Sequence, residues 1–213
     1  MISYITCKRK YFLAALAALT ALVASRSVFA IDLALIKLIQ SAPLEVFDRL
    51  SLFFTILGSG EVTGVITASL AAWLYLKNHK KAAFYLLLFF GLSVAVELSM
   101  KFSVEQPKVF AQFRRGLKIP VPIYSPFTPY AYPSGHATRS VILSIVFFYM
   151  AQLKIADEKI KARTKTFIVF ICALMLISRV YEGSHWPMDV IGGICLGSYL
   201  AALIIERFQK DNF

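Results

Sequence analysis

Two of the three histidines in this 213-residue chain lie in short polar runs within a sequence that is otherwise mostly apolar. The first run, 133–136, reads Pro-Ser-Gly-His, and the second spans 178–189. In the second run His185 and Asp189 are four residues apart, so they share one face if the chain is helical there. A carboxylate beside one imidazole nitrogen fixes the tautomer and leaves the other nitrogen free to react. This is the orienting half of a nucleophilic triad.

The first run has the features of a helix start that binds an anion. Pro133 precedes Ser134, Gly135 and His136, and an apolar segment follows them. We therefore expect a helix to begin here, with free backbone amides at its first turn. Such amides bind phosphate readily. Pro187 suits the first turn of another helix, which we expect to begin within the second run, just after His185.

Cations follow or end two other apolar segments. Lys101 lies at the end of one of them, with Lys108 just beyond it, and Arg179 lies at the end of another. A lysine supplies a point charge, whereas an arginine supplies a planar fork that can hold two phosphate oxygens. Phosphoryl transfer depends mainly on positioning and charge neutralisation, which cations and helix starts both provide. Because no acidic cluster offers a magnesium cage, we expect no metal and no other cofactor.

The elements that position these residues are apolar. Hydrophobic residues make up 58% of the chain and occur in long runs, more than a soluble core of this length could bury. Lipid offers no partner for an open backbone, so segments that approach the roughly 20 residues needed to cross it should be helices. Six segments qualify: 11–30, 60–76, 82–103, 136–153, 166–181 and 187–205. The predicted fold is all-α, a polytopic membrane helix bundle of about six transmembrane helices in one domain, 1–213.

Loop charge predicts the orientation of this bundle. Lysines and arginines are concentrated at 8–10, 77–81 and 154–165, which by the positive-inside rule are cytoplasmic together with both termini. The segments 31–59 and 104–135 and the turn before Pro187 then lie outside. This topology, derived from charge alone, brings the candidate residues to one membrane face: Lys101, Lys108, Ser134, Gly135, His136, Arg179, His185 and Asp189.

Two features of the first 60 residues have alternative interpretations. A basic start, an apolar stretch over 12–24 and small residues up to Ala30 also fit a signal peptide, although we favour a retained transmembrane helix over 1–30. A short interfacial helix is expected to begin near Pro43. We interpret it as a connector along the outer surface, in preference to the wall of a lipid-entry cleft.

Other residues near the polar runs have structural interpretations. Glu97 lies one turn before Lys101, and we expect the two to pair for burial. Arg139 lies one turn after the first histidine run and can reach the phosphate region. Gly193 and Gly197 form a Gly-x3-Gly pair that predicts close packing between helices.

In these motifs the chain resembles the type-2 phosphatidic acid phosphatase superfamily. The signature of that family has three parts: Lys-x6-Arg-Pro, Pro-Ser-Gly-His and Ser-Arg-x5-His-x3-Asp. Here the second part is complete at 133–136 and the third at 178–189. The first part departs from the pattern, because Lys101 is followed after six residues by Lys108 and Val109. The positive charge of the family arginine is kept, but its bidentate fork is lost.

The resemblance covers about half of the chain, 97–206, and implies a role for each matching residue. His185 would be the nucleophile, oriented by Asp189, and would form a phosphohistidine that water hydrolyses. His136 would protonate the leaving oxygen and later activate that water. The phosphate oxygens would be held by Lys101, Lys108, Ser134, Gly135 and Arg179.

The expected function is that of an integral-membrane lipid phosphatase on the outer face of a bacterial-type inner membrane. By resemblance, its candidate substrates are undecaprenyl pyrophosphate, which we favour, phosphatidylglycerol phosphate, phosphatidic acid and the phosphates of lipid A. One alternative is a phosphotransferase that passes the phosphate to another lipid. Another is a catalytically silent membrane protein that binds or transports lipid.

The net charge of +11 does not require a nucleic-acid partner. Loop topology and the candidate site already account for most of the basic residues. The expected partners are therefore the lipid bilayer and a phosphorylated lipid within it.

Overall fold

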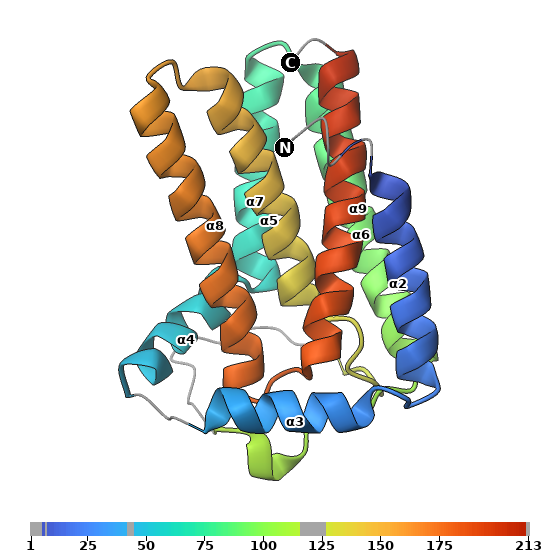
Figure 1. Ribbon diagram of the computed structural model, residues 1–213. Helices are drawn as coiled ribbons and strands as arrows, with labels where there is room; N and C mark the ends of the chain where they lie inside the picture. Colours follow the sequence, from blue (N-terminus) through green and yellow to red (C-terminus); the bar gives the residue numbers. More distant parts are fainter. Residues whose placement is uncertain (1–5, 7, 42–44, 116–126, 212–213) are drawn as a thin grey trace.

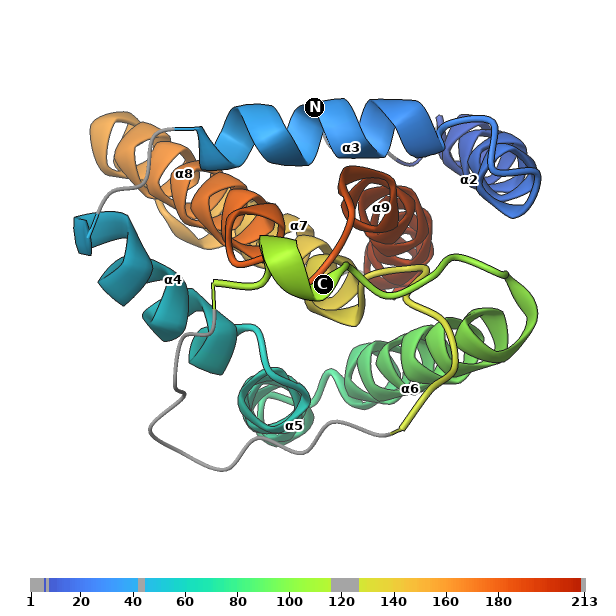
Figure 2. The ribbon, with the colours of Figure 1, turned by 90° about the horizontal axis from the view of Figure 1, so that it is seen from below.

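The computed structural model describes residues 6, 8–41, 45–115 and 127–211, and all regular secondary structure in these ranges is helical. Long helices run side by side as a bundle (Figure 1): α2 (Arg9–Ala24), α5 (Gly60–Leu76), α6 (Lys80–Ser103), α7 (Gly135–Lys154), α8 (Glu158–Tyr181) and α9 (Pro187–Lys210). At one end, α3 (Phe29–Gln40) lies across the bundle and α4 (Glu45–Leu57) packs against α8 (Figure 2). The predicted all-α class is confirmed.

Five of the six predicted apolar segments coincide with helices of the bundle. The helix α5 has the predicted bounds, whereas α8 begins eight residues before the predicted 166 and α9 continues five residues past 205. The early part of α8 is basic, so hydropathy could not reveal it. Its start is marked instead by Asp157, whose carboxylate accepts the Ile160 N–H at 2.9 Å.

The first predicted segment, 11–30, is wrong as a single helix. The helix α2 ends at Ala24, and Arg26 has a φ of 59° in a Schellman turn. In this turn the Arg26 N–H donates to the Val23 carbonyl at 2.9 Å, and the Ser27 N–H donates to the Leu22 carbonyl at 3.1 Å. The next helix, α3, runs at 97° to α2. The turn residues Ser25, Arg26 and Ser27 are polar, but they are flanked by apolar residues on both sides, and the prediction took the whole stretch as one segment.

The helix α3 is held against the start of α9 by one carboxylate. Asp32 is fully buried, and its Oδ1 accepts the Met188 N–H at 2.8 Å. Its Oδ2 accepts a hydrogen bond from the Gln106 side chain at 2.9 Å. A buried carboxylate without hydrogen-bond donors is costly. Folding α3 across the bundle gives Asp32 two donors.

Several helices have the length and composition to cross a membrane. Among the described residues, α6 and α9 are each long and apolar enough to cross a membrane alone. The bent pairs α2 with α3 and α4 with α5 meet the same test when each pair is counted as one span. The more polar α7 and α8 do not reach the same hydropathy, so the number of six transmembrane helices stays a prediction. The apolar stretch of α9 is 72% buried and that of α6 only 22%, which makes α9 the central helix.

Close packing of α7 on α9 sets the position of the site. A Cβ atom on Gly193 would lie 2.6 Å from the Ser134 carbonyl oxygen, and one on Gly197 would lie 2.6 Å from the Thr138 carbonyl oxygen. The predicted packing role of this Gly-x3-Gly pair is confirmed. It brings the starts of both helices together, and the Ser134 N–H donates to the Asp189 carbonyl at 2.9 Å.

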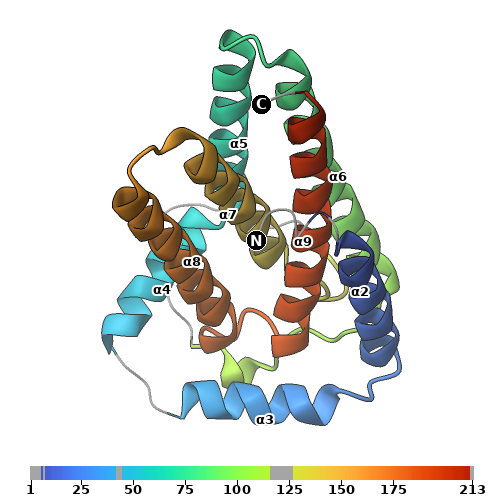
Figure 3. The same ribbon diagram turned by 45° about the horizontal axis from the view of Figure 1, so that its top comes forward.

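The loops separate into two sets at opposite ends of the bundle (Figures 1 and 3). The start of α2, the end of α9 and the two basic helix connections share one end, where Arg9 pairs with Glu206. At the other end lie α3, α4 and the starts of α7 and α9. This division agrees with the one predicted from charge. The membrane face that each end occupies stays a prediction.

Candidate active site

The first turn of α7 is built as the sequence predicts. Ser134 is the N-cap, its backbone is extended, and its hydroxyl oxygen accepts the Ala137 N–H at 3.4 Å. Gly135 is the first helical residue, and His136 follows in the same turn. Ser134 is fully buried, so a polar helix start is enclosed at this end of the bundle.

Gly135 lies directly against the Glu97 carboxylate of α6. A Cβ atom at this position would overlap that carboxylate, so a larger residue cannot be placed here without moving Glu97. The Glu97 carboxylate is 2.8 Å from the Lys101 ammonium and 2.6 Å from the Arg139 guanidinium. The expected pairing of Glu97 with Lys101 is confirmed. Arg139 is bound to the same buried carboxylate, so two cations adjoin the start of α7.

The end of α8 turns the chain sharply toward the second histidine. Gly183, with a φ of 70°, closes a Schellman turn in which its N–H donates to the Val180 carbonyl at 3.0 Å. The Ser184 and His185 amides donate to the Arg179 carbonyl at 3.0 and 3.1 Å. A Cβ atom on Gly183 would also overlap the Phe113 carbonyl. Glycine is thus required by backbone conformation and by space.

His185 and Asp189 form the predicted pair. The Nδ1 atom of His185 is 3.2 Å from Oδ2 of Asp189, and the same oxygen accepts the Trp186 N–H at 3.0 Å. Asp189 is fully buried at the start of α9. When Asp189 is ionised, its carboxylate can only accept a hydrogen bond, so the proton is then on Nδ1 and the lone pair on Nε2.

The surroundings of His185 keep its imidazole neutral. Burial, followed by the charges of Lys101 and Arg179, lowers the pKa of His185 to about 3. A neutral imidazole with a free Nε2 is the nucleophilic form. The same cations that disfavour the imidazolium are suited to hold an anionic phosphate beside it.

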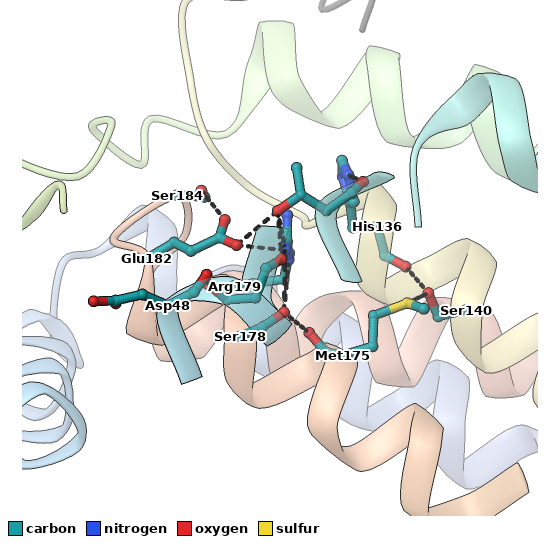
Figure 4. Close-up of polar contacts among 10 residues, drawn as sticks. Asp48, His136, Ser140, Met175, Ser178, Arg179, Glu182 and Ser184 are labelled. Atoms are coloured by element: carbon teal, nitrogen blue, oxygen red, sulfur yellow. Dashed lines mark hydrogen bonds and ion pairs between the residues drawn. The ribbon is translucent and has the colours of Figure 1, made fainter. Parts of the chain in front are cut away.

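The Arg179 guanidinium is buried and has several partners (Figure 4). Its Nη2 donates to the Thr55 hydroxyl at 2.6 Å, to the Glu182 carboxylate at 3.0 Å and to the Ser178 hydroxyl at 3.1 Å. Arg179, which we predict to bind the substrate phosphate, therefore lies near His185. The Glu182 carboxylate already contacts it.

His136 lies against Thr55 of α4. Its Nε2 is 3.2 Å from the Thr55 carbonyl oxygen, so Thr55 contacts both His136 and Arg179. A Cβ atom on Gly58, just after α4, would lie 3.0 Å from the His136 ring. The helix α4 is therefore a wall of the site, in addition to connecting α3 with α5. Its expected start at Pro43 lies outside the described residues.

Sequence reasoning missed Thr55 and Glu182. Thr55 lies in an apolar run, and Glu182 occupies a variable position inside the third motif. No spacing pattern distinguishes either of them, because their contacts arise only when α4 packs against α8. Both could be found only from the tertiary structure.

Lys108 is the predicted site residue whose contact is with an aromatic ring. Its side chain is exposed, and its ammonium lies 5.1 Å from the centroid of the Phe127 ring. The contacts described above bring the other predicted residues together: Lys101, Ser134, Gly135, His136, Arg179, His185 and Asp189. Over the described part of the chain, no group of three or more His, Cys, Asp or Glu residues is placed to hold a metal ion.

Two solved structures share this fold. A transmembrane PAP2-type phosphatidylglycerolphosphate phosphatase from Bacillus subtilis superposes with a TM-score of 0.78 at 22% identity, covering 95% of this chain and 96% of that one. LpxE from Aquifex aeolicus superposes with a TM-score of 0.58 at 24% identity, covering 82% of this chain and 94% of that one. At these identities the likeness shows the fold, which is that of a membrane phosphatase.

The sequence comparisons identify the family. An undecaprenyl-diphosphatase from Sulfolobus acidocaldarius is 30% identical over 81% of this chain and 76% of its own length. Phosphatidylglycerophosphatase B from Bacillus subtilis is 30% identical over 38% of this chain and 43% of its own length. The model of the PAP2 superfamily matches residues 82–213, which include every predicted site residue. The chain therefore belongs to the PAP2 superfamily and is a membrane phosphatase of that family.

Proposed function

We propose that this enzyme hydrolyses a phosphate monoester or diphosphate on a membrane lipid, on the outer face of a bacterial-type inner membrane. The observation that carries the proposal is the pair formed by a neutral His185 and the buried Asp189, next to Lys101 and Arg179. A free imidazole nitrogen, an orienting carboxylate and adjacent cations are the groups that phosphoryl transfer to histidine requires.

In the first step Nε2 of His185 attacks the phosphorus atom. An N–P bond forms while the bond from phosphorus to the leaving lipid oxygen breaks, and His136, protonated when the anionic phosphate is bound beside it, donates a proton to that oxygen. The positive charge that develops on the His185 ring is stabilised through Nδ1–H by Asp189, 3.2 Å away. The start of α7 and the neighbouring cations hold the phosphate oxygens.

In the second step water hydrolyses the phosphohistidine. His136 now accepts a proton from water, whose oxygen bonds to phosphorus as the N–P bond breaks. Inorganic phosphate leaves, and His185 returns to its neutral form. All proton transfers in this scheme are made by the chain and water.

The carrier-lipid diphosphate, undecaprenyl pyrophosphate, is our preferred substrate. This preference rests on the similarity to an undecaprenyl-diphosphatase, which aligns with 81% of this chain. Phosphatidylglycerol phosphate, phosphatidic acid and lipid A remain candidates of the same chemical class. An exposed apolar surface on the long helices suits a substrate that arrives within the bilayer.

The test is phosphate release from a panel of these lipids by detergent-purified enzyme, with His185→Ala as the control. We expect release by the wild type and its loss in the variant. Equal release by both proteins would show that the assigned nucleophile is wrong. With a radiolabelled phosphate, label on the protein indicates the phosphohistidine, and label on a second lipid indicates the phosphotransferase alternative. No release from any lipid supports the catalytically silent alternative.

A further inference from the structure

Glu182 is the acidic partner of the arginine that is expected to hold the substrate phosphate. Its Oε1 lies 3.0 Å from Nη2 of Arg179 and accepts a hydrogen bond from the Thr55 hydroxyl at 2.6 Å. Side-chain exposure is only 1% for Arg179 and 9% for Glu182, so solvent screens this ion pair weakly. A carboxylate of this chain thus occupies part of the anion site formed by Arg179.

The Glu182 carboxylate is held in place from several directions. Its Oε2 accepts a hydrogen bond from the Ser184 hydroxyl at 3.1 Å (Figure 4). Its backbone carbonyl accepts the Arg115 N–H at 3.1 Å. As the C-cap of α8, Glu182 precedes the turn that leads to His185. The carboxylate is therefore positioned by the same backbone that positions the nucleophile.

A phosphate that binds Arg179 must compete with this carboxylate or share the guanidinium with it. Either way Glu182 weakens binding, because it neutralises the cation and repels an incoming anion. A lipid phosphate gains further binding energy from its tail, whereas free inorganic phosphate has none. The penalty from Glu182 is the same for both anions, but only the lipid has tail contacts that offset it.

We propose that Glu182 lowers the affinity of the site for phosphate by competing for Arg179, so that inorganic phosphate, which has no tail contacts to offset this competition, binds weakly. The inference rests on the proposed function, in which Arg179 holds the substrate phosphate. Its consequence is weak inhibition by the inorganic phosphate that each turnover releases.

The decisive variant is Glu182→Gln, which keeps an oxygen that can accept from Arg179 and Thr55 but removes the charge. We expect the Kd for inorganic phosphate, measured by titration of the purified protein without substrate, to fall about tenfold. An unchanged or higher Kd would overturn the proposal, as would an absence of phosphate binding in both proteins. Should Glu182→Gln fail to fold, Glu182→Met has a similar length, no charge and the same expected result.

Asp48→Asn is the matched control. Asp48 is paired with Arg115 at 2.7 and 2.9 Å at the same end of the bundle, so this variant removes a nearby charge without touching Arg179. Its Kd for phosphate should equal that of the wild type. A tenfold fall here as well would mean that net charge, and not competition for Arg179, is responsible, which contradicts the proposal. Because binding is measured without turnover, a wild type that hydrolyses no lipid would contradict the proposed function separately.

Discussion

His185 and Asp189 meet through a single contact on which the chemistry depends, between Nδ1 and Oδ2 at 3.2 Å. In Asp189→Asn the side chain keeps its shape but presents either an amide N–H or a neutral oxygen to the ring. The amide favours the wrong tautomer, and the neutral oxygen no longer stabilises the charged ring. We expect kcat to fall roughly 10³- to 10⁴-fold with little change in KM. Steady-state kinetics on detergent-purified protein will measure this, and a kcat within tenfold of the wild type would contradict the assignment.

Burial of His185 also has a consequence for stability at low pH. Its pKa of about 3 in the folded state lies below the ordinary value near 6.5, so between these values the unfolded chain binds a proton that the folded chain does not. The folded state therefore loses stability as pH falls below about 6.5. This loss approaches roughly 2 kcal/mol at pH 5.

His185→Gln lacks this titration and isolates its effect. As pH falls from 7 to 5, the unfolding free energy of the variant should rise relative to that of the wild type. Thermal unfolding in detergent across that range will measure the shift. Titrating groups that do not contact His185 contribute equally to both proteins and cancel in the difference. A pH-independent difference would mean that His185 can be protonated in the folded state.

At the scale of residues, the motifs predicted most of the side chains that gather at the site. Ser134, His136, His185 and Asp189 are near their expected partners because their spacing defines two helix starts. Lys108 could not be placed by spacing, since it follows the end of α6 in an irregular segment where direction is set by tertiary contacts. The functional roles of all these residues stay predictions.

At the scale of elements, the contact between α7 and α9 sets the distance between the two helix starts. Gly193→Ala adds a methyl group 2.6 Å from the Ser134 carbonyl oxygen, so the helices must separate. We expect a loss of about 1–3 kcal/mol in stability and a lower kcat, because Ser134 and Asp189 move apart. Unfolding in detergent and steady-state kinetics will measure both effects.

Gly91→Ala in α6 is the control for this substitution. A Cβ atom on Gly91 would have no neighbour within 4 Å, so the same change removes only the flexibility of glycine. It should stabilise the helix by about 0.5–1 kcal/mol and leave kcat unchanged. If Gly193→Ala behaves like Gly91→Ala, close packing of α7 on α9 is not what positions the site.

Helices that are apolar throughout were predictable as elements, but bends and contacts were not. The turn between α2 and α3 is a short polar interruption between two apolar runs, Ser25, Arg26 and Ser27, and its left-handed residue is Arg26 in place of the usual glycine. The burial of Asp32 under α9 accounts for the direction of α3, and this contact joins residues 156 positions apart. Local sequence carries no record of such a pairing.

At the scale of the whole molecule, loop charge correctly divided the chain between two ends of the bundle, and it further predicts which end faces the cytoplasm. Lys37 on α3 is exposed at the end that holds the site, and Lys77 after α5 is exposed at the other end. If basic loops stay inside, Lys37 must be accessible from outside the cell and Lys77 must not.

Single cysteines at these two positions will test the orientation, in a background where Cys7, Cys172 and Cys195 are replaced by alanine. With intact bacterial cells, a membrane-impermeant thiol reagent should label Lys37→Cys and spare Lys77→Cys. After the cells are opened both should react, which controls for expression and accessibility. The reverse pattern in intact cells would place His185 on the cytoplasmic face. The enzyme would then meet its lipid substrate in the inner leaflet, because the site and α3 occupy the same end of the bundle.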